Sequence, residues 1–420
     1  MEWKEVTLGE ITNLVIDYRG KTPLKLGSSW SDSGYRALSA KNIKTGQIVA
    51  EDSIRFVDEE LYRKWMKDEV NRGDILITSE APFGQIYYWD SDEKIVLSQR
   101  LFDVRLNDEV CHKYVYYFMT SHRYQKDLEG RATGTTVTGL RQPELLKSTI
   151  LLPPLSAQRS IASILSSLDR KIELNNKINA DLEEMAQAIF KNWFVDFEPF
   201  KHGKFVASEL GMIPEGWKVS QIADIPHILE TGKRPKGGAV EKGIPSVGAE
   251  HVKGMCAYDY SKTKYINCEF AAKLKTGKIN GYELMIYKDG GKPGYFIPNF
   301  SIFGEGYPFE NCYLNEHVFK LDFDGNKEFN IFCYFFFKTE QIMSYFNAQG
   351  AKAAIPGINK KDVENIYIFS PDNESVIKFG EFAYPLFKQM LKNAIENRTL
   401  STLRDTLLPR LMSGELEVPE

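Results

Sequence analysis

Apolar residues recur at alternating four- and three-residue intervals over two long stretches of the chain, and this spacing predicts two long helices. In the first stretch, Ile161, Leu165 and Leu168 begin a series that continues to Trp193. No glycine or proline interrupts it, as a continuous helix requires. At 1.5 Å per residue such a helix would be about 50 Å long. Glycine and proline then accumulate over residues 201–216, which predicts a linker.

A second stretch repeats this spacing at an offset of 218 residues, the interval from Ile161 to Phe379, and continues to Leu411. Two asparagines occupy matching positions in each stretch. If the apolar seams pair, the helices run antiparallel, and buried asparagines fix register and partner choice at some loss of stability. The alternative is that the asparagines are merely exposed. The predicted seam residues are Leu168, Ile172, Asn175, Asn179 and Leu182 in the first helix and Leu386, Met390, Asn393, Asn397 and Leu400 in the second.

The segments that precede the two helices also repeat. Trp3-Lys4 corresponds to Trp217-Lys218, and Gly73-Asp74-Ile75-Leu76 corresponds to Tyr282-Glu283-Leu284-Met285. Runs of β-branched and aromatic residues between turn residues predict strands, whereas wider apolar spacing predicts helices. In the first copy we expect strands over residues 73–78, 85–89, 95–105 and 148–152 and helices over residues 58–66 and 112–128.

These patterns together predict an α+β protein. Two tandem α/β domains would be joined by two long antiparallel coiled-coil helices, with a pseudo-two-fold axis relating the two copies. Helices of this length exceed one turn of DNA, which is about 34–36 Å, so two binding modules could address separated sites. The expected parts are a first domain over residues 1–154, a first helical segment over 155–200, a linker over 201–216, a second domain over 217–372 and a second helical segment over 373–420.

Composition and charge narrow the class of protein. The 420 residues are 43% hydrophobic and 26% charged, as in ordinary globular proteins. The net charge of −4 means that any basic surface must be local. Five cysteines without a C-x-x-C pair disfavour a disulfide framework or a zinc site and fit the reducing cytoplasm. The most apolar run, Ile331 to Phe337, is too short to cross a membrane, so we expect no membrane contact.

Catalytic motifs are missing from the sequence. Gly20-Lys21-Thr22 lacks the first glycine of a phosphate-binding loop, because position 15 is valine. Metal-binding H-E-x-x-H and nucleophile-elbow G-x-S-x-G motifs are absent. Asp74 and Glu80 have no E-x-K partner of a nuclease and are predicted to be solvated or capping carboxylates. The chain is therefore predicted to have no catalytic residues, no metal and no cofactor of its own.

Polar and basic loop residues remain as candidates for binding DNA. Arg and Lys donate to guanine edges, Gln and Asn match adenine, and Ser or Thr suit either base. These residues differ between the copies while the scaffold repeats, as expected if each copy reads a different sequence. The candidates are Arg19, Lys21, Thr22, Ser79, Phe83, Gln85, Ser98, Gln99, Arg100, Thr135, Thr136 and Arg141 in the first copy and Lys233, Arg234, Lys236, Lys288, Lys292, His317, Lys352, Asn359 and Lys360 in the second.

Several motifs together resemble the specificity (S) subunits of type I restriction–modification systems, over essentially the whole chain. The motifs are Trp3-Lys4, Leu8-Gly9-Glu10-Ile11, Gly73-Asp74-Ile75-Leu76, LPPLSAQR from Leu152 to Arg159, LDRKIELN from Leu168 to Asn175, LGMIPEGW from Leu210 to Trp217, and LMSGEL from Leu411 to Leu416. The second copy departs from the pattern after Pro371, where Asp372-Asn373-Glu374-Ser375 replaces Pro154-Leu155-Ser156-Ala157.

The resemblance implies a non-catalytic reader of double-stranded DNA with two target-recognition domains, each reading one half of an asymmetric bipartite site. It also implies two modification subunits that bind S-adenosylmethionine and methylate adenine, and restriction subunits that use ATP and Mg²⁺. An alternative is a protein-interaction scaffold with two modules on a coiled-coil spacer and no role on DNA. A stand-alone enzyme with degenerate motifs is the least supported class.

Overall fold

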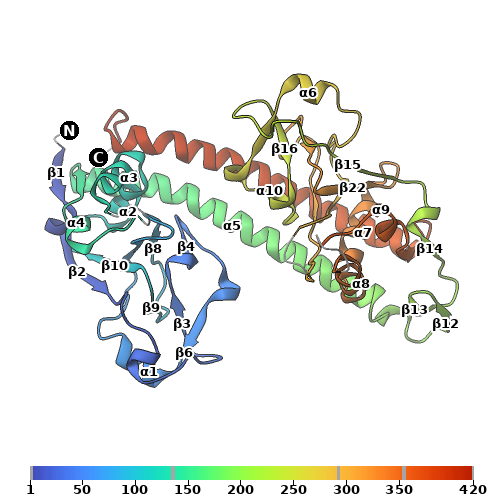
Figure 1. Ribbon diagram of the computed structural model, residues 1–420, viewed down its shortest axis with the longest axis horizontal. Helices are drawn as coiled ribbons and strands as arrows, with labels where there is room; N and C mark the ends of the chain where they lie inside the picture. The colour runs from blue at the N-terminus through green and yellow to red at the C-terminus, as the bar shows by residue number, and fades with distance from the viewer. Residues whose placement is uncertain (1–2, 134–137, 291–293, 352–355, 419–420) are drawn as a thin grey trace. The chain divides into compact units, whose positions relative to one another are not determined.

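A computed structural model describes residues 3–133, 138–290, 294–351 and 356–418. The chain divides into two compact units, one of residues 1–171 with 400–420 and the other of residues 172–399. Each of the two long helices therefore contributes residues to both units. The ribbon in Figure 1 follows the chain through both units in colour.

Unit 1 is built on a four-stranded sheet in the order β2-β10-β7-β8 and a three-stranded sheet in the order β6-β3-β9. All four residues of β7 are buried, so both faces of this central strand are covered. The strands are β1 (Lys4–Thr7), β2 (Thr12–Asp17), β3 (Tyr35–Leu38), β4 (Ile43–Lys44), β5 (Gln47–Ile48), β6 (Arg55–Val57), β7 (Ile75–Thr78), β8 (Ile86–Tyr88), β9 (Val96–Leu97), β10 (Leu101–Leu106) and β11 (Thr149–Leu152).

The helices of unit 1 are α1 (Glu59–Trp65), α2 (His112–Thr120), α3 (His122–Arg131) and α4 (Gln142–Leu146). Asp58 caps α1, where its carboxylate accepts the backbone N–H of Leu61 at 2.8 Å. The single helix expected over residues 112–128 is two helices, because extended backbone at Ser121 ends α2 and the Ser121 hydroxyl caps α3. The strand expected over residues 95–105 is also divided, since Arg100 takes a left-handed φ of 63°.

Unit 2 repeats both sheets, with one additional strand, β17, at the edge of the larger one. Its larger sheet has the order β15-β22-β19-β20-β17, and its smaller sheet has the order β18-β16-β21. The central strand of each small sheet has one antiparallel and one parallel neighbour in both units. The strands are β14 (Val219–Gln221), β15 (Ile228–Thr231), β16 (Ile244–Val247), β17 (Gly254–Met255), β18 (Lys264–Ile266), β19 (Leu284–Tyr287), β20 (Phe300–Ile302), β21 (Tyr313–Leu314), β22 (Val318–Asp322) and β23 (Tyr367–Phe369).

The helices of unit 2 are α6 (Cys268–Ala272), α7 (Lys327–Phe337), α8 (Glu340–Gly350) and α9 (Lys360–Glu364). The apolar run from Ile331 to Phe337 lies in α7 and is buried, as its composition predicts. Residues 201–216 were expected to be a linker but contain a two-stranded antiparallel hairpin, β12 (Phe205–Ser208) with β13 (Gly211–Pro214). Gly211 supplies the positive φ that the turn requires.

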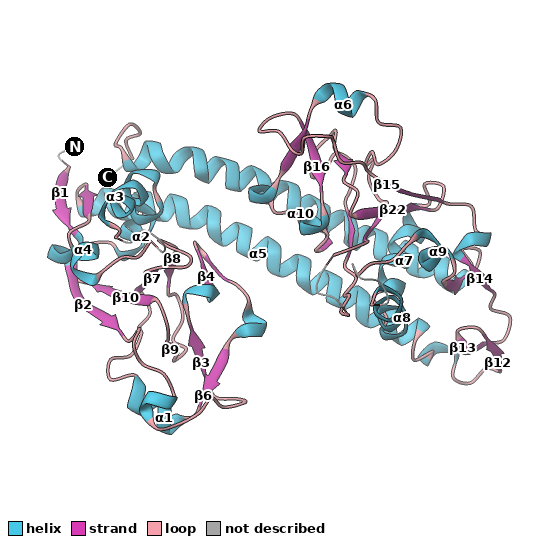
Figure 2. Ribbon diagram, in the orientation of Figure 1, coloured by secondary structure: helices cyan, strands magenta, loops and turns pink. Residues whose placement is uncertain are grey.

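The two long helices are α5 (Leu155–Phe194) and α10 (Glu374–Met412), shown in cyan in Figure 2. α5 begins directly after Pro153-Pro154, earlier than the apolar spacing predicts. α10 contains Pro385, which removes a backbone N–H from the helix interior. It also contains Gly380, where a Cβ would lie 2.7 Å from the Cβ of Glu328, so α10 can approach the start of α7 closely.

Each end of the helix pair is buried within its own unit. In unit 1, Ile161 and Leu165 of α5 share a core with Leu411 of α10 and the aromatic residues of α2. In unit 2, Phe190 of α5 and Phe379 of α10 pack against the phenylalanines of α7. Burial of these large side chains is the main source of stability for helices of this kind. Within the described ranges, no helix is both long and apolar enough to cross a membrane.

Candidate nucleic-acid interface and helix pair

Four of the predicted DNA-binding residues of unit 1 lie together in one open hollow. Arg19 follows β2, Ser79 follows β7, and Gln99 and Arg100 lie between β9 and β10. Pairing of β10 with both β2 and β7 brings these three chain segments together. Ser79 is 1% exposed and forms part of the wall rather than the accessible surface. Asp17, Gly20 and Glu80 complete the lining.

Arg19 is held in a fixed orientation. Its Nε and Nη2 atoms donate to the two oxygens of Asp17 at 2.8 and 2.7 Å. Its Nη1 atom donates to the backbone carbonyl of Leu140 at 3.3 Å. The guanidinium carbon lies 4.0 Å from the centre of the Phe102 ring. Two carboxylate bonds, a carbonyl and an aromatic face therefore position one cation.

Arg100 has a carboxylate partner as well. Its Nε lies 2.9 Å from an oxygen of Glu80, and both side chains are partly exposed. The backbone carbonyl of Arg100 accepts the N–H of Ser79 at 2.9 Å, which ties the two edges of the hollow together. Glu80 was predicted to be solvated or capping, and the structure instead pairs it with this arginine. Neither Asp17 nor Glu80 was among the predicted binding residues.

The other carboxylate that the sequence draws attention to is structural. Asp74 is 2% exposed, so it is not solvated. It accepts Nε and Nη2 of Arg105 at 3.0 and 2.8 Å, and it also accepts the backbone N–H of Asn71 at 2.7 Å. The prediction of a solvated or capping carboxylate is therefore wrong for Asp74, which is buried in a turn before β7 and begins no helix, and Arg105 compensates its charge.

The remaining candidates in unit 1 lie outside the hollow. Lys21 donates to the carbonyl of Trp65 and lies over the Tyr18 ring, and burial lowers its pKa. Gln85 accepts from Thr45 at 3.0 Å, and Ser98 is buried. Phe83 packs against the core, whereas Thr22 is partly buried and Arg141 is exposed. Thr135 and Thr136 lie outside the described residues.

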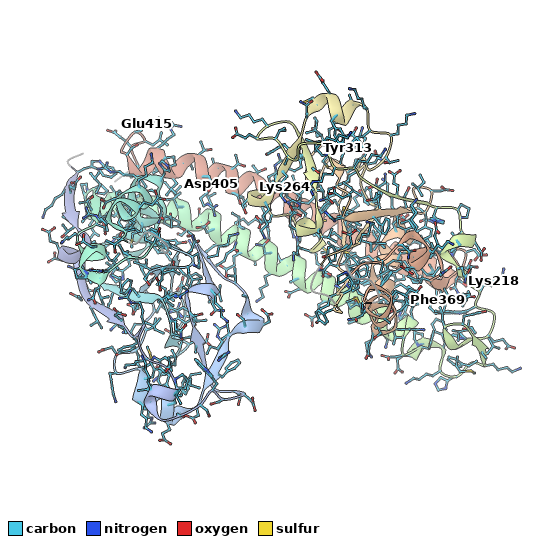
Figure 3. The ribbon with its side chains drawn as sticks, in the orientation of Figure 1. Lys218, Lys264, Tyr313, Phe369, Asp405 and Glu415 are labelled. Atoms are coloured by element: carbon cyan, nitrogen blue, oxygen red, sulfur yellow. The ribbon has the colours of Figure 1, made fainter. Side chains whose placement is uncertain are left out.

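Unit 2 carries a hollow of different charge beside its small sheet. Lys233, Arg234 and His317, all predicted from the sequence, line it together with Lys264, Asn315 and Glu316. Figure 3 shows Lys264 and Tyr313, which come from the strands on either side of β16. His317 lies 3.3 Å and Arg234 3.7 Å from an oxygen of Glu316. Cationic side chains outnumber carboxylates in this lining.

The other candidates in unit 2 are divided between the surface and structural roles. Lys236 is exposed. Lys288 pairs with Asp289 at 2.5 Å, and the same carboxylate accepts a hydrogen bond from Nδ1 of His317. Asn359 caps α9, and Lys360 donates to the carbonyl of Leu229. Lys292 and Lys352 lie outside the described residues.

The predicted seam asparagines meet between α5 and α10 in unit 2. Asn175 donates to Asn397 at 2.9 Å, and Asn393 donates to Asn179 at 2.8 Å. Asn179 also donates to the carbonyl of Met390 at 3.1 Å. Because the later residue of α5 faces the earlier residue of α10, the helices are antiparallel here. The apolar seam residues Leu168, Ile172, Leu182, Leu386 and Leu400 are half-buried, and Met390 is buried.

Within unit 1 the same two helices are linked by charge. Asp169 of α5 accepts Nη1 of Arg404 of α10 at 2.8 Å, and its other oxygen accepts the hydroxyl of Tyr117 at 2.7 Å. The chain thus carries two copies of one pair of sheets, each copy with a polar hollow, together with two paired long helices.

Comparison with known proteins identifies the kind of scaffold. The family described as the type I restriction modification DNA specificity domain matches residues 1–184. The type I restriction enzyme MjaIX specificity subunit of Methanocaldococcus jannaschii is 32% identical over 359 residues, covering 83% of this chain and 79% of that protein. The HindI specificity subunit of Haemophilus influenzae is 25% identical over 415 residues, covering 83% and 88%.

A solved structure has the same fold. The crystal structure of the type I restriction–modification S subunit from M. genitalium aligns with a TM-score of 0.57 at 16% identity, over 98% of this chain and 96% of that one. The chain belongs to the family of type I restriction–modification specificity subunits, as its sequence motifs predict.

Proposed function

We propose that this chain reads a bipartite, asymmetric DNA target, with one half-site contacted by each unit. The observation that carries the proposal is the contrast between two equivalent sheets and two different hollows. The strand orders β2-β10-β7-β8 and β15-β22-β19-β20 match. The hollow of unit 1 balances two arginines with two carboxylates, whereas that of unit 2 is rich in cations. Two copies of the same fold with different binding surfaces are what a protein needs to contact two different DNA sequences.

The helices supply the spacing in this proposal. Residues 155–200 and 373–420 would form an antiparallel coiled coil, and residues 1–154 and 217–372 would form the two target-recognition domains. A pseudo-two-fold axis between the copies would match the local symmetry of duplex DNA. The hydrogen-bonded asparagines support a specified register, which a fixed distance between two half-sites requires.

Catalysis would come from partner subunits. We infer that two modification subunits bind this chain, hold S-adenosylmethionine and methylate adenine in each half-site. Restriction subunits would add ATP- and Mg²⁺-dependent translocation and cleavage. This chain would contribute sequence recognition and the docking surface. Its described residues contain no group of three or more potential metal ligands.

Methylation mapping tests the proposal directly. Adenine methylation is mapped across genomic DNA from the source cells with and without this gene. The expected result is the loss of one split motif with two short halves around an unspecified gap. If no motif loses methylation without this gene, and the purified complex shows no salt-dependent binding to duplex DNA, the protein-interaction scaffold is the better description.

Replacing the exposed cations of unit 2 tests the assignment of half-sites. Lys233→Ala, Arg234→Ala and Lys236→Ala together should weaken binding through one half-site only. The measurement is affinity for duplexes in which one half at a time is scrambled. An equal loss of affinity whichever half is scrambled would show that these residues contact phosphates without regard to sequence. The affinity of the variant should then also depend less steeply on salt concentration.

A further inference from the structure

The two arginines of the unit 1 hollow share an arrangement that is uncommon for a general DNA-binding surface. Each has a carboxylate partner, Asp17 for Arg19 and Glu80 for Arg100. The two positive and two negative charges cancel, so the hollow has little net attraction for phosphate. What remains is a set of directional N–H donors at fixed positions, which is the requirement for reading base edges.

Arg19 retains donors beyond those that fix it. A guanidinium carries five N–H donors, and Asp17 and the carbonyl of Leu140 accept three of them. Within the described residues the others have no acceptor, and the side chain is 31% exposed. The Arg100 side chain is 50% exposed, and among the described residues its ion-pair partner is Glu80. Both arginines can therefore donate to a ligand without breaking their carboxylate contacts.

We infer that the half-site read by unit 1 contains guanine, and that Arg19 and Arg100 contact it through the major groove. Guanine presents two adjacent acceptors there, O6 and N7, which match two N–H groups of one guanidinium. Asp17 and Glu80 act as positioning residues that hold each arginine before DNA arrives, which lowers the entropy lost on binding. The inference rests on the proposed function, in which unit 1 contacts one half of the target.

Replacement of guanine by 7-deazaguanine tests this contact, because the analogue keeps the base pair but lacks the N7 acceptor. Affinity of the complex of this chain with its modification subunits is measured on the mapped target, with each guanine replaced in turn. The wild type should lose about tenfold affinity at each of two guanines in one half-site, one for each arginine. Arg19→Ala and Arg100→Ala, which remove every side-chain donor, should each abolish the sensitivity at the guanine that the replaced arginine contacts.

Two further variants separate base reading from a structural role. Arg72→Ala is the matched control, because Arg72 is also held by carboxylates, Asp90 and Asp92, but does not line the hollow. It should keep the wild-type sensitivity to the analogue at every position. Asp17→Asn should reduce the sensitivity that depends on Arg19 and leave the other positions unchanged. The Arg100 side chain is half exposed, so Arg100→Ala is expected to leave the fold intact even if Arg19→Ala does not.

Loss of the guanine contact and loss of specific DNA binding give different results in these measurements. If both arginine variants keep the full sensitivity of the wild type at every guanine, or if the wild type is insensitive throughout, the arginines do not read guanine N7. Specific binding of the natural target would persist in either case. Loss of discrimination between target and scrambled duplex by the wild type would instead overturn the proposed function itself.

Discussion

At the scale of single residues, one equivalent buried position holds an acidic residue in unit 1 and a basic residue in unit 2. Asp103 in β10 is fully buried, and neither carboxylate oxygen has a hydrogen-bond partner in the described chain. Burial raises the pKa of Asp103 well above its ordinary value, and the negative charge of Asp74 raises it further. The equivalent position in β22 is Lys320, whose Nζ lies 2.9 Å from Glu230 and 3.8 Å from Glu283.

The raised pKa of Asp103 predicts that Asp103→Asn changes the free energy of unfolding by an amount that depends on pH. A carboxyl whose folded-state pKa is raised binds its proton more tightly in the folded chain, so its contribution to stability falls as pH rises above about 4 towards the folded pKa. The variant should therefore be more stable than the wild type at pH 8, by about 1–3 kcal/mol, and the gain should be smaller at pH 5.

Urea denaturation followed at both pH values measures the effect of Asp103→Asn, with the unfolding of unit 1 reported by hydrogen exchange in β10. A difference between variant and wild type that does not change with pH would contradict a raised pKa at this position. Asn keeps an amide donor that can face Asp74, so the substitution changes charge more than shape.

At the scale of elements, the asparagines between α5 and α10 form hydrogen bonds with one another and also specify how the two helices align. Asn393 is 4% exposed and donates to Asn179 across the helix pair. An apolar seam can slide by a heptad with little penalty, whereas a displaced asparagine leaves a buried donor without an acceptor. The polar pairs are therefore the elements of the seam that distinguish one register from another.

A double-mutant cycle should detect this coupling. Asn179→Leu alone removes the acceptor of the buried Asn393 amide and should destabilise unit 2 by about 1–3 kcal/mol. Asn179→Leu combined with Asn393→Leu should be close to neutral or stabilising, because both polar partners are then replaced. The free energy of unfolding of the two single variants and the double variant gives the coupling energy. Simple additivity would show that the pair does not interact.

At the scale of the whole molecule, the proposed function assigns the paired helices the role of setting the gap between half-sites. Seven residues inserted after Lys177 in α5 and after Ile395 in α10 would preserve the apolar spacing. They would add about 10 Å of paired helix. We expect the unspecified gap of the recognised motif to lengthen, by up to about three base pairs at 3.4 Å each.

Methylation mapping of cells that carry the double insertion measures the gap. The same insertion in α5 alone serves as the control and should abolish methylation, because it shifts the asparagines out of register. A double insertion that leaves the recognised gap unchanged would show that the helices do not determine its length.

Several features of the protein could be predicted from the amino-acid sequence alone. The spacing of apolar residues predicted both long helices, and the matched asparagines predicted positions that the structure brings together. The repeat of Gly73-Asp74-Ile75-Leu76 at Tyr282-Glu283-Leu284-Met285 predicted that equivalent strands β7 and β19 would occur in both halves. These properties depend on local periodicity and on self-similarity, which are visible without any knowledge of long-range contacts.

Contacts between distant segments were decided only by the tertiary structure. The sequence pattern pointed to Arg19 and Arg100 but not to their carboxylates, and it treated Glu80 as a solvated or capping group. Arg19 and Arg100 reach one hollow because β10 lies between β2 and β7, and that order is selected by burial of the apolar strand faces. The hairpin within residues 201–216 was missed because its glycine and proline content predicted a linker. The break at Ser121 was missed because apolar spacing alone does not register a serine that caps α3. The amino-acid sequence by itself thus determined the internal repeat and the two long helices. The pairing of the strands in the sheet determined which charged side chains lie next to one another in the hollow.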